Sequence, residues 1–341
     1  MNDVARGEVL LRATDVVKHF PVRGGSLRRR ADRPVVHAVD GVSFEVRKGE
    51  TLGVVGESGC GKSTLGRCLV RLTELTSGRV EVADRDITTL SRRALRPVRR
   101  DVQLVFQDPY ASLNPRRRIG EVIAEPLEVH RYGTPAAIRT RVGELLELVG
   151  LSDAHADRYP HEFSGGQRQR VGIARALAIT PQLIVADEPV SALDVSIQAQ
   201  VLNLFADLQD ELGLTYVFIA HDLGVVRHVS DRIAVMYLGE IVELADADLL
   251  YDAPAHPYTE ALLSAAPEID DGREQPSGPR IVLTGDVPNP IDKPAGCAFH
   301  PRCPLAQDRC RQERPQLTGI GAGRLVACHF PLAGTDAGGQ P

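Results

Sequence analysis

The pattern of hydrophobic and polar positions in the first 70 residues predicts three strands followed by a helix. Residues 9–20 and 35–46 alternate partly between apolar and polar side chains and are rich in β-branched residues, as strands are. The short apolar run at 51–56 ends in glycine, which is typical of a strand buried in a parallel sheet. We expect the next helix to begin near Lys62.

Helix-like and strand-like patterns alternate in the middle of the chain. One helical face precedes Gly150 and consists of Val142, Leu145, Leu146 and Val149. A second helical face precedes Gly213 and consists of Val201, Leu204, Phe205, Leu208 and Leu212. Strand-like runs at 183–187 and 215–221 flank this second helix. Strands that alternate with helices predict a parallel α/β sheet.

The pattern changes from about residue 246, where proline and glycine rise and periodicity fades. Residues 270–280, DDGREQPSGPR, have the composition of a linker. We expect a second, small C-terminal unit that carries four of the six cysteines.

Earlier in the chain, the basic stretch 21–34 predicts a solvated hairpin loop, with contact to anionic lipid as the alternative.

Composition narrows the class of protein. A chain of 341 residues suggests two or more structural units, and 43% hydrophobic with 25% charged residues is ordinary for a globular protein. The net charge of −5 gives no support to nucleic-acid binding. The N-terminus lacks a signal-peptide pattern, and no apolar run reaches the ~18 residues of a membrane helix. We expect a cytoplasmic protein that reaches any membrane through a partner.

GESGCGKST fits the phosphate-loop pattern G-x-x-x-x-G-K-[ST] and lies between a predicted strand and a predicted helix. Its glycines allow backbone N–H groups to surround phosphate oxygens, and the helix N-terminus adds partial positive charge. Lys62 is expected on the β- and γ-phosphates and Ser63 on Mg²⁺, while Cys60 is a small filler or, alternatively, a redox group. The nucleotide-binding residues of this loop are Gly56, Glu57, Ser58, Gly59, Cys60, Gly61, Lys62, Ser63 and Thr64.

Two further motifs carry chemistry. LIVADEP (183–189) is an apolar strand that ends in two carboxylates, of which Asp187 is expected to hold Mg²⁺ and Glu188 to act as general base toward water. In FSGGQRQR (163–170), Ser164 can cap a helix, and the glycines after it allow backbone approach to a phosphate. This motif follows the phosphate loop by about 100 residues and comes shortly before LIVADEP, an order that makes it diagnostic.

With these motifs in this order, residues 9–245 resemble the nucleotide-binding subunit of an ATP-binding cassette (ABC) transporter. The resemblance implies an α/β phosphate-loop NTPase fold with a RecA-like parallel sheet core, an antiparallel β subdomain and a helical subdomain at about 108–170. Residues 246–341 would form a small cysteine-containing extension. The resemblance also implies that Gln107 contacts Mg²⁺ and water, that residues 191–194 cross to the partner ATPase, and that His221 contacts the γ-phosphate. Phe20 falls where the family stacks an aromatic on adenine, although a core phenylalanine at a strand end is equally ordinary.

In this family two subunits face each other head to tail and bind ATP between them. On this resemblance, the segment that completes the partner's site consists of Ser164, Gly165, Gly166 and Gln167. The residues Lys62, Asp187, Glu188 and His221 serve the chain's own site. None of these motif positions is degenerate, so we expect a hydrolytically competent ATPase.

Three longer stretches, 108–127, 189–204 and 253–267, resemble the peptide permease branch, which imports dipeptides, oligopeptides or nickel. Residues 189–200 and 237–243 are more similar to the second of its two ATPase subunits. The resemblance implies a heterodimer with a paralogous ATPase, two membrane-spanning permeases and an extracytoplasmic binding protein. It places the chain at the cytoplasmic face of the membrane.

The cysteines of the tail have the spacing C-x5-C-x6-C-x17-C and are Cys297, Cys303, Cys310 and Cys328. Disulfides, unrelated free thiols and a metal site are the three alternatives. Disulfides conflict with a reducing compartment. Unrelated free thiols are harder to reconcile with four cysteines in 32 residues, because cysteine is a rare residue. Four thiolates fit either [4Fe–4S] or Zn²⁺, with His300 and His329 as further donors. The resemblance to the peptide permease branch favours iron–sulfur over zinc, with a structural role in the linker region.

Alternative functions leave different marks on a sequence. A soluble ABC-type ATPase acting on DNA or ribosomes would carry a long coiled-coil insertion, two cassettes or a strongly basic face, and none is visible. A binding protein without ATP turnover would have lost Glu188 or His221. An ABC exporter would have fused membrane helices. An importer of nickel or another small solute remains the alternative to a peptide importer.

Overall fold

The computed structural model describes residues 7–22, 34–265 and 281–332. The contacts between residues divide the chain into two compact units, each made of three separate segments. The first contains Met1–Leu11, Val46–Thr51 and Glu81–Ile219, and the second contains Arg12–Glu45, Leu52–Val80 and Ala220–Pro341. The predicted linker at 270–280 lies outside the described residues, as does most of the basic stretch at 21–34.

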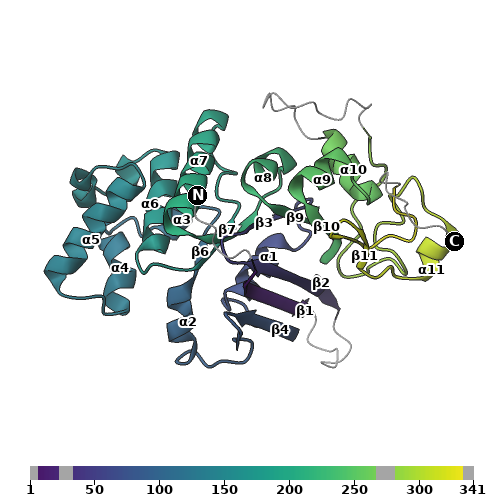
Figure 1. The fold of residues 1–341 in the computed structure, drawn as a ribbon, viewed down its shortest axis with the longest axis horizontal. Helices are drawn as coiled ribbons and strands as arrows, with labels where there is room; N and C mark the ends of the chain where they lie inside the picture. The colour runs from purple at the N-terminus through teal and green to yellow at the C-terminus, as the bar shows by residue number, and fades with distance from the viewer. Residues whose placement is uncertain (1–6, 23–33, 266–280, 333–341) are drawn as a thin grey trace. The chain divides into compact units, whose positions relative to one another are not determined.

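The first unit combines a parallel sheet with a group of helices. Helices α4, α5 and α6 pack on one another and lie together in Figure 1. None of the described helices is both long and apolar enough to cross a membrane. The elements are β5 (Arg85–Asp86), α2 (Leu95–Asp101), β6 (Val102–Val105), α3 (Pro109–Ser112), α4 (Ile119–Val129), α5 (Pro135–Leu148), η2 (Asp153–Asp157), η3 (Pro160–Glu162), α6 (Gly165–Leu177), β7 (Leu183–Asp187), α7 (Val195–Leu212) and β8 (Thr215–Ile219).

The parallel strands of this unit deliver functional residues to one edge. Strand β7 pairs with β6 on one side and β8 on the other, and Asp187 lies opposite Ile219. Every residue of β7 and β8 is buried, as expected for parallel strands covered on both faces. The sequence predicted both strands, but β8 ends at Ile219, so His221 lies beyond the strand.

The two predicted helices of this unit are present as α5 and α7. Helix α5 begins after Thr134, whose side chain accepts a hydrogen bond from the Ala137 N–H. Helix α7 ends at Gly213, which has φ +65° and provides the left-handed residue that terminates many helices. Phe205 of α7 packs edge-on against the rings of Tyr216 and Phe218 of β8, with ring centroids 5.4 and 5.5 Å apart.

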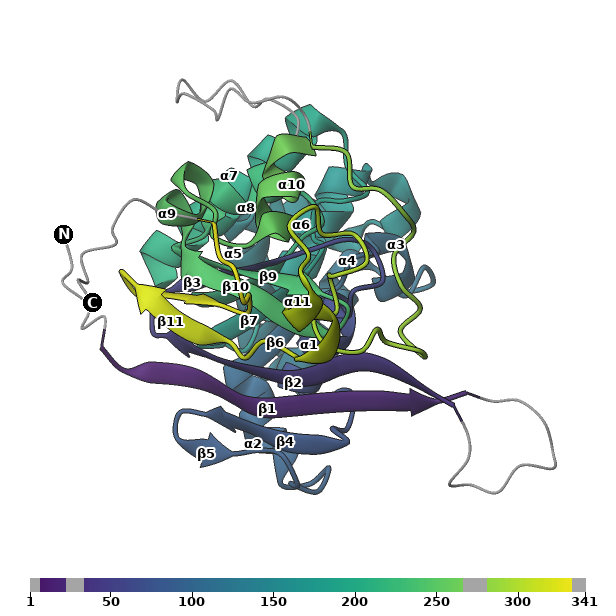
Figure 2. The same cartoon turned by 90° about the vertical axis from the view of Figure 1, so that its right-hand side faces the viewer.

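The second unit contains the phosphate-loop segment and most of the C-terminal third of the chain. In it, strand β3 pairs with β9 in parallel, and β10 pairs with both β9 and β12 antiparallel. Strands β2, β1 and β4 pair in that order in a second sheet and run side by side in Figure 2. The elements are β1 (Val9–Pro21), β2 (Val35–Arg47), β3 (Thr51–Val55), α1 (Lys62–Leu69), β4 (Ser77–Val82), α8 (Leu223–Val229), β9 (Arg232–Tyr237), β10 (Glu240–Asp246), α9 (Ala247–Asp252), α10 (Pro257–Ala265), α11 (Asp308–Gln312), β11 (Thr318–Gly321) and β12 (Arg324–Val326), the outermost residues of β1–β4 belonging to the first unit.

The C-terminal segment is integrated into this second unit. Its strand β12 extends the sheet, with Val326 opposite Glu243. Phe299 is 1% exposed and packs on Tyr237 of β9 and Tyr258 of α10, with ring centroids 5.2 and 5.3 Å away. Sheet pairing and a shared aromatic cluster therefore hold the cysteine-bearing segment against β10, β9 and α10, and β9 in turn pairs with β3, the strand that precedes the phosphate loop.

Candidate functional site

The phosphate loop turns sharply between β3 and α1. Gly56 and Gly61 have φ of +150° and +107°, and a Cβ on either would lie within 2.1 Å of a backbone oxygen, that of Met236 or Ala38. Side chains are therefore excluded at these two positions by the surrounding backbone. A phosphate loop needs bare backbone at such positions, and the binding of phosphate here stays a prediction.

Lys62 is the first residue of α1 and is 4% exposed. Its Nζ donates hydrogen bonds to the Gly56 and Glu57 carbonyl oxygens at 2.7 and 3.1 Å. The loop itself thus holds the ammonium at its centre, where a phosphate would meet it. Cys60 is 5% exposed and burial raises the pKa of its thiol, so the filler reading suits it better than the redox alternative.

Arg302 and Tyr258 contact the phosphate loop from the C-terminal segment. The guanidinium of Arg302 donates two hydrogen bonds to the Glu57 carboxylate, at 2.6 and 3.0 Å. The Glu57 N–H donates to the Tyr258 hydroxyl at 3.0 Å. The sequence predicted neither role, although Tyr258 lies in the singled-out stretch 253–267 and Arg302 lies between Cys297 and Cys303. Nothing local in those stretches indicates a contact with residue 57.

Replacing Arg302 with alanine is expected to raise the Kd for ATP about tenfold, or about 1.4 kcal/mol. The Arg302 side chain is 7% exposed, so its loss leaves the Glu57 carboxylate uncompensated beside the bound phosphates. Titration of the full chain with a fluorescent ATP analogue measures this change. The Glu57→Gln/Arg302→Ala double variant should recover most of the affinity.

Arg309→Ala is the matched control for this experiment. Arg309 also pairs with a glutamate, Glu313, but both side chains are more than half exposed and water screens the pair. Its replacement should leave the Kd unchanged. Equal effects of the Arg302 and Arg309 variants would show that the contact with Glu57 does not support nucleotide binding.

In the first unit, Asp187 and Glu188 lie at the end of β7. Asp187 is 1% exposed, and Glu188 has φ +47°, an uncommon backbone conformation for this residue. The Glu188 N–H donates to the Ile219 carbonyl at 2.9 Å, and the Ser191 hydroxyl donates to the Glu188 carbonyl at 3.1 Å. These backbone contacts fix a strained residue, which is a feature of functional sites.

Gln107 meets Glu188 in the same unit. It follows β6, and its Nε2 donates to Glu188 Oε2 at 2.7 Å. The two residues are 81 positions apart in the sequence, and the parallel pairing of β6 with β7 brings their ends together. The structure therefore joins two residues that the sequence assigned to one task, the positioning of water.

The Ser-Gly-Gly-Gln segment forms the N-terminus of α6. Ser164 Oγ accepts from the Gln167 N–H at 3.3 Å, and Gln167 Oε1 accepts from the Ser164 N–H at 3.0 Å, so the predicted cap is present as a reciprocal capping box. A Cβ on Gly166 would lie 2.4 Å from Ile197 Cγ2 of α7, and one on Gly165 would lie 3.2 Å from a Leu193 methyl. Close packing against Ile197 thus disfavours any side chain at Gly166, quite apart from any phosphate, whereas Gly165 is only tightly packed against Leu193.

The remaining predicted residues lie in the second unit. His221 follows β8 and immediately precedes Asp222, the N-cap of α8, whose Oδ1 accepts from the Gly224 N–H at 2.8 Å. Phe20 is 39% exposed near the end of β1, and Lys18 Nζ lies 4.8 Å from its ring centroid. This exposure excludes a role for Phe20 as a core residue, and stacking on adenine stays the prediction.

The four tail cysteines line one cavity together with His300 and His329. Burial raises the pKa of the Cys297 thiol to about 11, and the three other cysteines add to this shift. Burial also raises the pKa values of Cys303 and Cys328. The lining residues are His256, Pro257, Cys297, Phe299, His300, Cys303, Leu305, Cys310, Cys328, His329 and Phe330.

Comparisons with known proteins agree with these features. The ABC transporter family profile matches residues 39–191, and the profile of the oligopeptide/dipeptide transporter C-terminal region matches residues 242–310. The oligopeptide transport ATP-binding protein AppF of Bacillus subtilis is 54% identical over 96% of this chain and 98% of its own length. The di/tripeptide transport ATP-binding protein DppF of Pseudomonas aeruginosa is 52% identical over 94% of this chain and 98% of its own length.

A solved structure supports the fold. The ATP-binding cassette MJ0796, in a dimeric post-hydrolysis state bound to ADP and Pi, is 31% identical with a TM-score of 0.62, over 70% of this chain and 99% of its own. The loop, the strand-end carboxylates and the fold define a phosphate-loop ATPase with a parallel sheet core, as the sequence predicted. The chain belongs to the ATP-binding proteins of ABC transporters, within the group that carries the oligopeptide/dipeptide C-terminal region. It is thus a transport-coupled, ATP-hydrolysing enzyme.

Proposed function

We propose that this chain hydrolyses ATP to drive the import of dipeptides or oligopeptides through an ABC permease. The observation that supports the ATPase is the Gln107–Glu188 contact at the end of β7, which orients the carboxylate that we propose as general base. The peptide substrate is supported by the names of the relatives, AppF and DppF, and by the C-terminal region shared with them.

Each predicted site residue has a role in this proposal. Lys62 and the loop N–H groups bind the phosphates, while Ser63, Gln107 and Asp187 supply oxygen ligands of the kind that Mg²⁺ prefers. The metal ion offsets phosphate charge when bound, and Glu188 takes a proton from the attacking water. His221 contacts the γ-phosphate, and Phe20 stacks on adenine. Ser164, Gly165, Gly166 and Gln167 act in trans.

The assembly follows from the same family relationship. We propose a head-to-tail dimer with a paralogous ATPase, two membrane-spanning permeases and an extracytoplasmic binding protein, at the cytoplasmic face of the membrane. Residues 9–245 form the ATPase domain in this proposal, with a helical subdomain at about 108–170 facing the permease and residues 246–341 as the extension. Membership of a transporter family supports the permease contact, and the paralogous partner rests on the resemblance to the second subunit.

Transport assays test the proposed substrate. The full transporter, in lipid vesicles with its binding protein inside, should hydrolyse ATP faster when a dipeptide or oligopeptide is added and should move that peptide. Stimulation by Ni²⁺ and not by peptide would favour the nickel alternative. A rate of ATP hydrolysis that changes neither with added solute nor with the presence of the permease would contradict a transport function.

We also propose that the cysteine cavity holds a [4Fe–4S] cluster with a structural role. The donor set fits, because four thiol side chains meet in one cavity with an apolar lining that limits solvent access. Four thiolates fit either [4Fe–4S] or Zn²⁺, and the resemblance of the tail to the peptide permease branch is what favours the cluster over zinc.

Metal analysis tests this assignment. Full-length protein purified without oxygen should contain about four iron and four sulfide per chain and show broad visible absorption. Cys310→Ala, which removes a 6% exposed ligand, should lose both. Cys68→Ala is the control, because Cys68 is buried in α1 outside the cavity. Zinc without iron, or no metal in either protein, would reject the cluster.

A further inference from the structure

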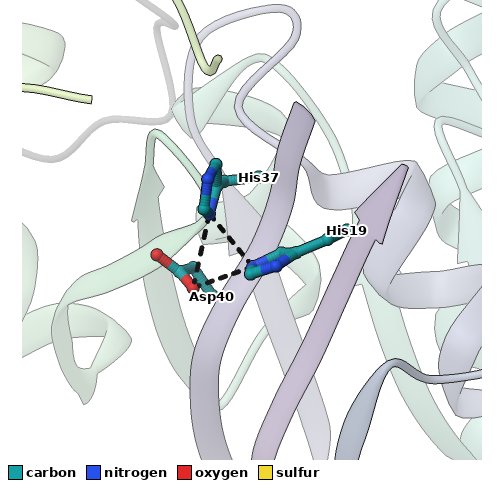
Figure 3. Close-up of side chains that lie close together, drawn as sticks. All are labelled: His19, His37 and Asp40. Carbon is teal, nitrogen blue, oxygen red and sulfur yellow. Dashed lines mark hydrogen bonds and ion pairs between the residues drawn. The ribbon is translucent and has the colours of Figure 1, made fainter. Parts of the chain in front are cut away.

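His19, His37 and Asp40 form a compact cluster at the paired strands β1 and β2, and their side chains point toward one another (Figure 3). His19 Nε2 lies 3.0 Å from Asp40 Oδ1 and 3.1 Å from His37 Nδ1. The third distance, from His37 Nδ1 to Asp40 Oδ1, is 4.0 Å. The side chains are 17–29% exposed, so solutes reach them.

These distances match those between ligands of one metal ion. A tetrahedral ion with ligands at about 2.05 Å has ligand atoms about 3.3 Å apart. The three observed separations, 3.0, 3.1 and 4.0 Å, bracket that value. An ion at the centre of the cluster therefore requires only small shifts of the three side chains.

Hydrogen bonding alone does not account for the arrangement. A ring nitrogen carries at most one proton, yet His19 Nε2 faces both a carboxylate oxygen and another ring nitrogen. In any one tautomer, His19 Nε2 either donates to Asp40 Oδ1 or accepts from a His37 Nδ1–H, so only one of its two contacts is an ordinary hydrogen bond. A cation bound to the lone pairs of both ring nitrogens and of Asp40 Oδ1 would satisfy all three atoms.

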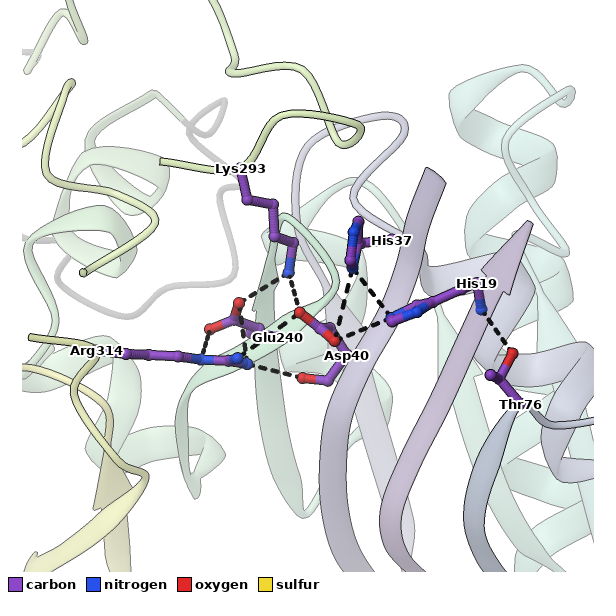
Figure 4. A network of polar contacts seen from close by, with 7 residues as sticks. All are labelled: His19, His37, Asp40, Thr76, Glu240, Lys293 and Arg314. Carbon is purple, nitrogen blue, oxygen red and sulfur yellow. Dashed lines mark hydrogen bonds and ion pairs between the residues drawn. The ribbon is translucent and has the colours of Figure 1, made fainter. Parts of the chain in front are cut away.

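A second layer of charged groups holds Asp40 in position (Figure 4). Lys293 Nζ donates to Asp40 Oδ2 and to Glu240 Oε1, both at 2.8 Å, and the Arg314 guanidinium contacts Glu240 at 3.1 Å and the Asp40 carbonyl at 2.9 Å. These contacts engage Oδ2 and leave Oδ1 directed at the two rings. Such outer contacts orient the first ligands of metal sites.

The same groups select the kind of ion. Lys293 and Arg314 balance the charges of Asp40 and Glu240, so the cluster offers little net negative charge to a hard cation. Two imidazoles suit Zn²⁺, Ni²⁺ and Cu²⁺, whereas Mg²⁺ and Ca²⁺ prefer several oxygens. We propose that His19, His37 and Asp40 bind a divalent transition-metal ion of this imidazole-preferring class, at a site separate from the cysteine cavity.

Protonation states at neutral pH suit the proposal. Burial, and then the charges of His19, Lys293 and Arg314, lower the pKa of His37, which keeps this ring neutral, although Asp40 opposes the shift. Burial alone would raise the pKa of Asp40, but the hydrogen bond and charge of Lys293, with His19 and Arg314, lower it to about 2. A neutral ring and an ionised carboxylate are the forms that bind metals.

Zinc titration of the full chain tests the site. In competition with a chromogenic chelator at pH 7.5, without nucleotide, the wild type should bind one more equivalent of Zn²⁺ than the His19→Gln/His37→Gln variant. The cysteines are the same in both proteins, so zinc on thiols cancels. His228→Gln, which changes an exposed histidine outside the cluster, should bind as the wild type does.

Thermal unfolding shows whether each variant is folded and measures zinc binding independently of the chelator. Zinc should raise the midpoint of the wild type more than that of the single variant His37→Gln. Magnesium should change neither midpoint through this cluster. Equal zinc stoichiometry and equal midpoint shifts in the wild type and the variants would overturn the proposal.

Discussion

Glu188→Gln is expected to lower the rate of ATP hydrolysis about 10²–10⁴-fold in the assembled transporter. Glutamine keeps the size of the side chain but cannot accept a proton from water. Gln107 and the Ile219 carbonyl hold residue 188 in its φ +47° conformation, and the substitution leaves the backbone contact intact. ATP affinity should therefore change little, which separates a loss of chemistry from a loss of binding.

The measurement combines single-turnover hydrolysis with nucleotide binding on the same preparation. Glu147→Gln in α5 is the matched control, because Glu147 is exposed on a helix and belongs to none of the nucleotide-binding motifs. It should hydrolyse ATP at the wild-type rate. Full activity of Glu188→Gln would remove Glu188 as general base, and with it the central residue of the proposed site.

Gly61→Ala is expected to destabilise the chain by more than about 3 kcal/mol and to abolish ATP binding. The new methyl would meet the Ala38 carbonyl oxygen at 1.9 Å, and a backbone atom in a paired strand cannot move aside cheaply. The residue would also have to hold φ +107°, which disfavours any residue with a Cβ. The loop must then change shape at Gly61, the residue immediately before α1.

Gly59→Ala separates the two causes, because Gly59 has φ +81° but a Cβ there would meet nothing within 4 Å. It should cost only about 1–2 kcal/mol and retain measurable ATP binding. Denaturant unfolding of the full-length variants, followed by nucleotide titration, measures both quantities. Similar costs for Gly59→Ala and Gly61→Ala would show that the contact with Ala38 is not what restricts residue 61.

Local patterns predicted the elements well because their causes are local. Helix α7 ends at Gly213, where the left-handed conformation is available without a Cβ penalty. Ser164 and Gln167 cap α6 through contacts only three residues apart. The predicted end of β8 was less accurate, because the strand stops where its pairing with β7 stops, and side-chain character does not decide that point.

The class of protein follows from local motifs, because the chemistry of the phosphate loop, the Ser-Gly-Gly-Gln segment and the strand-end carboxylates depends on spacing within a few residues. The fold, and no local pattern, brings Arg302 to Glu57, 245 positions away, and Lys293 to Asp40, 253 positions away. It also brought His19 and His37 together from two strands and the four cysteines into one cavity. Such contacts depend on which strands pair and which side chains pack together, and no local periodicity records that choice.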